Sequence, residues 1–257
     1  MKRHTGLPAI GLLAMALTLP LVAQPVRRLA AHGFASDEQT IPVMANTTGF
    51  GGAKFQTYVT LLNPTSSAFP VVATLHDGTG ATKTATINLA AGELQTYDNF
   101  LDAVFHATGG GAVTFRAPDS TGGTHNNRFI VTAEVWTATG GKYSTPVPAV
   151  EFAGTSSPSF SAGVTVDAQT RTNVGCFNQS GVTNHVRARV FDRTGQQTVG
   201  TVDLNLAANG WGQTPVNAIV GGGYIEFVPE EAAVCYAVVV DNGTNDGRFV
   251  PAVEYRP

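Results

Sequence analysis

Histidine is a common metal ligand and general base, and the candidates in this chain are His76, His106, His125 and His185. None of them pairs at the H-x-x-x-H or H-E-x-x-H spacing that brings two imidazoles onto one zinc ion. The chain also lacks the G-x-S-x-G motif, which places an activated serine on a strand-to-helix turn. These patterns give no support for a zinc enzyme or a serine hydrolase.

Carboxylate pairs can cleave glycosides, and Glu134, Glu151 and Glu254 are the candidates for such a pair. Glu151 and Glu254, however, occupy the same position in the two copies of an internal repeat described below. A repeat-equivalent residue at the end of a copy is more simply structural or an exposed strand charge. We therefore expect a protein that is not an enzyme and has no catalytic residues.

The segment 241–247 is rich in side-chain oxygens and is the best candidate for a metal site. Asp241, Asn245 and Asp246 could bind calcium, which prefers carboxylate and amide oxygens. The spacing does not follow the EF-hand loop, and no glutamate stands at the twelfth position. Asn-Gly and Asp-Gly pairs also predict a tight hairpin, so both interpretations stay open. No other cofactor is expected.

Aromatic side chains could stack on a sugar or a peptide. The candidates are Trp136 and Tyr143, together with His125 and Asn126 from the segment 119–128, which only one copy of the repeat contains. Loop insertions are common places for binding. The alternative is a variable loop, with aromatics that complete a core or a strand pair.

The elements that must position these residues are organised by the internal repeat. Five blocks recur in the same order. They are 58–63 with 173–178, 75–80 with 190–195, 88–91 with 205–208, 109–115 with 221–227, and 147–152 with 250–255. The copies run from about Ile41 to Phe152 and from about Phe160 to Tyr255, joined by a short polar linker.

The two cysteines replace two aliphatic residues of the other copy: Cys176 corresponds to Leu61, and Cys235 corresponds to Val131. This comparison predicts a buried contact between two sheets. Two cysteines in an exported chain favour a disulfide, and closing a loop of about 60 residues contributes about 4 kcal/mol in the entropic treatment. A metal or redox pair is the alternative, but it lacks C-x-x-C spacing and nearby histidines.

Within each copy the hydrophobic pattern has the period of a β-strand. The expected inward residues are Phe55, Thr57, Val59 and Leu61 in the first copy, and Val186, Ala188 and Val190 in the second. Arg187 and Arg189 mark the solvent face of the second strand. The segments 77–80 and 192–195 predict hairpins, and Asp98 is expected to cap one short helix. About seven short strands per copy predict an all-β protein with two tandem antiparallel β-sandwich domains.

The blocks V-T-L-L-N-P, D-G-T-G, L-A-A-G-E, G-G-G-A-V-T-F and V-P-A-V-E-F resemble immunoglobulin-like repeats of exported proteins from soil-type bacteria. The resemblance covers most of 41–255. It implies an immunoglobulin-like or fibronectin-like sandwich and no defined activity. The second copy departs from the pattern at Gln179, in place of Pro64, and at 209–211, in place of 92–94.

The N-terminus is typical of an export signal, because Lys2 and Arg3 precede an apolar run from Leu7 to Ala23. We expect a signal peptide at 1–23, an N-terminal extension at 24–40, a first domain at 41–152, a linker at 153–159 and a second domain at 160–257. The protein should then be extracellular, on the cell surface or periplasmic. The apolar run is too short for a stable membrane span.

Composition limits the partners. Charged residues make up 13% of the chain, the net charge is −3 and no Lys/Arg cluster follows the signal, so no nucleic-acid partner is expected. One function class is a structural or adhesive protein that binds itself or another surface protein. In it, the segment 24–48, which contains the strand-like Ile41–Met44, could either supply the first strand of its own domain or add to a neighbour's sheet edge and build a fibre. The other class is a glycan- or peptide-binding module, which requires Trp136, Tyr143 and the 119–128 loop on one exposed surface.

Overall fold

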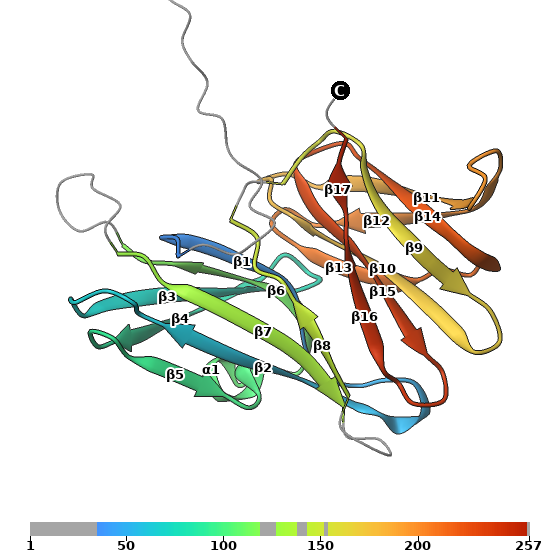
Figure 1. Ribbon diagram of the computed structural model, residues 1–257. Helices are drawn as coiled ribbons and strands as arrows, with labels where there is room; N and C mark the ends of the chain where they lie inside the picture. Colours follow the sequence, from blue (N-terminus) through green and yellow to red (C-terminus); the bar gives the residue numbers. More distant parts are fainter. Residues whose placement is uncertain (1–34, 119–126, 138–142, 152–153, 256–257) are drawn as a thin grey trace, which may run out of the picture.

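The computed structural model describes residues 35–118, 127–137, 143–151 and 154–255, and these residues form almost entirely antiparallel β-structure (Figure 1). We call 35–151 the N-terminal half and 154–255 the C-terminal half. The expected signal peptide, His125 and Asn126 lie outside the described residues. Within the described part of the chain, no helix is long and apolar enough to span a bilayer.

The N-terminal half contains one continuous sheet and one short helix. Its elements are β1 (Glu38–Thr48), the 3-10 turn η1 (Phe50–Gly52), β2 (Lys54–Leu62), β3 (Phe69–His76), β4 (Thr82–Leu89), β5 (Leu94–Tyr97), α1 (Phe100–Phe105), β6 (Gly109–Arg116), β7 (Ile130–Thr137) and β8 (Tyr143–Val147). The strand order is β4-β3-β6-β1-β2-β7-β8, with β5 paired to β2.

The C-terminal half contains two sheets. Its strands are β9 (Ser159–Val166), β10 (Thr170–Asn178), β11 (Asn184–Asp192), β12 (Thr198–Leu206), β13 (Trp211–Pro215), β14 (Val220–Pro229), β15 (Ala233–Asp241), β16 (Gly247–Pro251) and β17 (Val253–Glu254). The sheets have the orders β13-β10-β15-β16 and β12-β11-β14-β9-β17. An apolar core fills the space between them, which is the arrangement of a β-sandwich. The three antiparallel sheets confirm the all-β prediction.

Strand pairing follows the repeat. In the N-terminal half β2 pairs with β5 and β7, and β3 pairs with β4 and β6. In the C-terminal half β10 pairs with β13 and β15, and β11 pairs with β12 and β14. Six of the seven expected inward residues are fully buried, namely Thr57, Val59, Leu61, Val186, Ala188 and Val190, whereas Phe55 is half-buried.

Strand β1 joins the two sides of the N-terminal sheet. It pairs with β6 over most of its length and with β2 at its end, and the register shifts between Ile41 and Met44. Both of these side chains are fully buried. Of the two positions considered for this strand, the structure therefore has the first, inside the chain's own sheet.

A buried asparagine explains why one block of the repeat ends in Asn. The Asn63 Nδ2 donates to the carbonyl oxygens of Ser67 and Ala90, each at 2.8 Å. The Asn178 Nδ2 donates to those of Val182 and Ala207, each at 2.7 Å. Each amide thus ties together two loops whose carbonyl groups would otherwise lack a partner.

The two cysteines form a disulfide, as predicted, but its geometry differs from the prediction. Cys176 and Cys235 face each other directly on the neighbouring strands β10 and β15, with Cα atoms 4.1 Å apart. The bond therefore lies within one sheet and does not connect two sheets. Leu61 and Val131 form the equivalent cross-strand pair on β2 and β7, so the repeat identified the right partners.

The short helix begins one residue later than expected. Asn99 is its N-cap and makes no side-chain capping bond, so the assignment of Asp98 as the cap was wrong. Phe100, Leu101 and Phe105 are buried in the N-terminal core, and Phe100 packs 5.4 Å from Phe115 between ring centroids. The helix therefore closes the N-terminal core.

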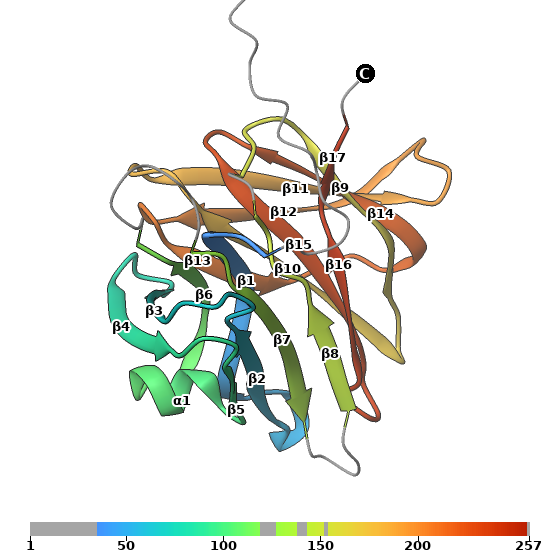
Figure 2. The ribbon, with the colours of Figure 1, turned by 60° about the vertical axis from the view of Figure 1, so that its left-hand side comes forward.

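The sheet β13-β10-β15-β16 is covered on both faces. One face carries Val174, Cys176 and Ala237 into the C-terminal core. The other face carries Tyr236, which belongs to the N-terminal core, and Trp211, Val238 and Phe249, which pack against that core. Figures 1 and 2 show the consequence: the halves lie against each other, with β8 next to β16.

Candidate binding site between the two halves

A cavity of about 370 Å³ lies between the halves. The N-terminal half contributes residues of β1, η1, β2, β7 and β8, and the C-terminal half contributes residues of β10, β13, β15 and β16. Its apolar lining includes Val43, Phe55, Val135, Val147, Val238, Val240 and Phe249. Its polar lining includes Thr137, Thr145, Arg171, Asn173, Gln213 and Asn245. A mainly apolar hollow with a few polar groups is typical of small-molecule sites.

A buried tyrosine supports one wall of this cavity. The Trp211 Nε1 donates to the Tyr236 hydroxyl at 2.9 Å, and that hydroxyl donates to the Gln213 Oε1 at 3.1 Å. The Tyr236 ring stacks on Phe249 at 5.1 Å between centroids. Burial raises the pKa of Tyr236 far above its ordinary value, so the phenol stays neutral and keeps both hydrogen bonds.

The mouth of the cavity carries a cation and an exposed ring. The Arg171 guanidinium lies 5.3 Å from the centre of the Phe50 ring, within the range of a cation–π contact. Phe50 is 64% exposed and sits in the η1 turn, where Gly51 and Gly52 have φ angles of 67° and 79°. These angles favour glycine. The two residues of this contact come from different halves.

The direct contacts between the halves hold the cavity walls in place. The Trp211 backbone N–H donates to the Asp77 carbonyl at 3.0 Å, and the Thr145 hydroxyl donates to the Gly247 carbonyl at 2.7 Å. The Trp211 ring also lies over Gly110, where an added Cβ atom would be 2.8 Å from its Cη2. Gly110 is therefore needed for the halves to approach this closely.

His76 belongs to the same interface. It is 8% exposed, its ring lies 4.6 Å from that of Phe177, and its Nδ1 lies 3.2 Å from the Asn209 carbonyl oxygen. His76, at the end of β3, is therefore buried against the C-terminal half. Burial lowers the pKa of His76, although the backbone contact with Asn209 partly offsets this.

The aromatic residues chosen from the sequence do not form one surface. Trp136 is opposite Ser144 and Tyr143 is opposite Thr137 on β7 and β8. Because successive residues of a strand point to opposite faces, Trp136 and Tyr143 lie on opposite faces of the sheet. Tyr143 lines the cavity, whereas the Trp136 Nε1 donates to the Asp98 carbonyl at 3.3 Å.

The candidate calcium residues lie in the hairpin between β15 and β16. The Asp241 Oδ1 accepts bonds from the backbone N–H groups of Gly243 at 2.9 Å and Thr244 at 2.7 Å. The Asn245 Oδ1 accepts a bond from Arg171 at 2.8 Å. Both oxygens are thus already used as acceptors within the chain. Among the described residues, no group of three or more His, Cys, Asp or Glu side chains is placed to hold a metal ion.

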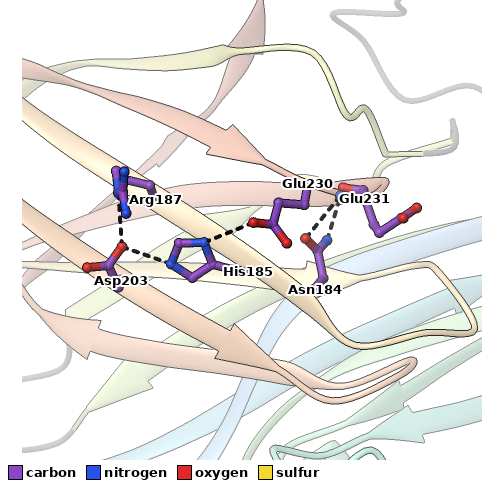
Figure 3. Close-up of polar contacts among 6 residues, drawn as sticks. All are labelled: Asn184, His185, Arg187, Asp203, Glu230 and Glu231. Atoms are coloured by element: carbon purple, nitrogen blue, oxygen red, sulfur yellow. Dashed lines mark hydrogen bonds and ion pairs between the residues drawn. The ribbon is translucent and has the colours of Figure 1, made fainter.

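A second polar cluster lies on the outer face of β11, β12 and β14 (Figure 3). His185 lies between Asp203, at 2.9 Å, and Glu230, at 3.4 Å, and Arg187 contacts the same Asp203 oxygen at 3.2 Å. The bond from Arg187, with a smaller contribution from His185, lowers the pKa of Asp203. The cluster is thus a network of ion pairs, and Asn184 is joined separately to the backbone of Glu231.

No protein-family model matches this chain, and no curated protein matches it. The site therefore has to be interpreted from its own chemistry. The sequence contains two indications of the contact between the halves that forms this cavity. The run Val234–Val240 lacks the polar alternation of a half-exposed strand, as expected when both faces are covered. In addition, Trp211 replaces Leu94 of the other copy, which is 57% exposed.

Proposed function

We propose that this is an exported, non-catalytic binding protein whose small ligand occupies the cavity between the two halves. We further propose that each half is an immunoglobulin-like sandwich domain. The cavity itself carries the proposal, because its volume and mainly apolar lining fall within the range of small-molecule sites, which often lie between domains. The disulfide points to an oxidising compartment, which supports an extracellular, cell-surface or periplasmic location.

The test uses a neutral fluorescent probe, N-phenyl-1-naphthylamine, whose emission rises in an apolar site. We expect saturable binding of one probe per chain. Val238→Phe places a larger side chain in the cavity and should abolish binding, whereas Val182→Phe, at an exposed loop residue, should not. Absence of saturable binding, or equal binding to both variants, would contradict the proposal.

A structural or adhesive role is the second candidate, with this chain or another surface protein as the partner. One observation favours it: β4 and β12 are terminal strands of their sheets, and such strands can pair with a strand from another chain. Light-scattering chromatography over a range of concentrations tests this role. Oligomers that grow with concentration would support it, and a constant monomer mass would count against self-assembly.

A further inference from the structure

We infer that the ligand is an amphipathic monoanion, with an apolar body in the cavity and a carboxylate-type group held by Arg171. This inference rests on the proposed function and adds the chemical class of the ligand. It is carried by the charge distribution of the lining together with the hydrogen bonds that Arg171 makes.

Among the cavity-lining residues that the structure describes, Arg171 is the one charged side chain. The other polar side chains of this described lining are threonines, amides and Tyr143. Because a guanidinium stays protonated at physiological pH, the site combines a mainly apolar interior with a single positive charge. A ligand of one negative charge complements this distribution, whereas a cationic ligand would be repelled.

The hydrogen bonds of Arg171 do not neutralise its charge. Its two terminal nitrogens donate to the Asn242 Oδ1 at 2.9 Å and the Asn245 Oδ1 at 2.8 Å, and both acceptors are neutral amides. Asp241 acts on Arg171 as a nearby opposite charge, while its Oδ1 accepts the bonds of its own turn. Contacts among the described residues thus use two of the five N–H donors that a guanidinium has.

The two amides also orient the guanidinium. They come from the hairpin between β15 and β16, and the Phe50 ring lies over the guanidinium from the other half. Arg171 is therefore held at the mouth while the apolar side chains of Val238 and Phe249 line the cavity. An anionic group would meet Arg171 near the η1 turn, and the apolar body would extend between the halves.

The experiment compares decanoate with decanol, in monomeric form, by isothermal titration of the full chain. Hydrogen bonds to charged groups contribute about 1.5–3 kcal/mol, and about 1.4 kcal/mol corresponds to a factor of ten. We therefore expect decanoate to bind the unmodified protein at least about tenfold more tightly than decanol. Equal affinities would overturn the inference and leave the proposed function standing, whereas the failure of both ligands, and of the neutral probe, would contradict both.

Two variants test whether Arg171 supplies the positive charge that binds decanoate. Arg171→Met should weaken binding of decanoate at least about tenfold more than binding of decanol, because the neutral ligand makes no charge-assisted contact with the guanidinium. Arg171→Lys keeps the charge and should recover most of the decanoate affinity. If Arg171→Met no longer binds the neutral probe, the comparison of decanoate with decanol on the unmodified protein decides. A decanoate preference that persists in Arg171→Met with its cavity intact would refute the role of Arg171.

Discussion

Replacing Gly175 by alanine should destabilise the protein strongly, although it adds only one methyl group. A Cβ atom at this position would overlap the Tyr236 hydroxyl and lie 2.9 Å from its Cε2. The tyrosine has little room to move, because its side chain is fully buried, stacks on Phe249 and makes hydrogen bonds to Trp211 and Gln213.

The expected cost follows from these contacts. Overpacking costs about 1–3 kcal/mol, and loss of the two phenol hydrogen bonds costs about 1 kcal/mol each. The less flexible unfolded chain offsets about 0.4–1 kcal/mol. We therefore expect the free energy of unfolding to fall by about 2–5 kcal/mol, measured by urea denaturation with tryptophan fluorescence. Gly181→Ala is the matched control, since no atom lies within 4 Å of its added Cβ.

A double-mutant cycle tests the cause. Tyr236→Ala alone should cost about 3–5 kcal/mol, as other large-to-small aromatic replacements in cores do. In that background Gly175→Ala should be neutral or slightly stabilising, because the ring that it would displace is gone. Equal costs of Gly175→Ala in the two backgrounds would refute the packing described for the inter-half contact.

Three further predictions concern the same interface and the sheet behind it. Replacing Cys176 and Cys235 together by alanine should lower the free energy of unfolding by about 4 kcal/mol in the entropic treatment, because the bond closes a loop across a sequence separation of 59. A reducing agent should then lower the urea midpoint of the unmodified protein and leave that of the double variant unchanged. Trp211→Leu should cost about 2–3 kcal/mol of stability through lost apolar burial. Leu94→Ala, at the exposed equivalent position of the other copy, should change stability by less than about 0.5 kcal/mol, and similar losses for both variants would contradict the packing of Trp211 between the halves. Because the pKa of His76 is lowered in the folded protein, the unfolded chain binds a proton at this residue first as pH falls. The contribution of neutral His76 to stability is therefore complete above about pH 6.5 and is lost as pH falls below it. His76→Gln should flatten the dependence of unfolding free energy on pH between pH 7 and 5, and an unchanged slope would exclude His76 as the cause.

Local structure could be predicted well from the sequence because the repeat supplies two versions of each element. The pairing of Cys176 with Cys235 is one example, since Leu61 and Val131 take the same positions in the other half. The repeat does not say whether such partners lie across one sheet or between two sheets. Both arrangements bury the pair, so burial alone could not distinguish them.

The cavity could not be predicted in the same way because it depends on how the halves meet. The contact between the halves is determined by positions at which the two copies differ. On the same face of the equivalent strands, the N-terminal half has Thr60 and Thr132, whose hydroxyls are exposed and 2.6 Å apart, and the C-terminal half has Gly175 and Tyr236. Gln179, which departs from the repeat, accepts a hydrogen bond from Gly154 in the expected linker. Tyr236 thus packs into the core of the other half, and Gly175 leaves room for its ring.

The doubly covered sheet has a consequence for how the protein opens. Strand β15 gives side chains to both hydrophobic cores, and β10 pairs with it in the same sheet, so separating the halves would expose one whole face of that sheet to water. Opening of either half alone is therefore penalised by the other, and the two halves should unfold as one cooperative unit. The slowest amide hydrogen exchange should then be found in β10 and β15, in the middle of the molecule, at nearly the free energy of global unfolding.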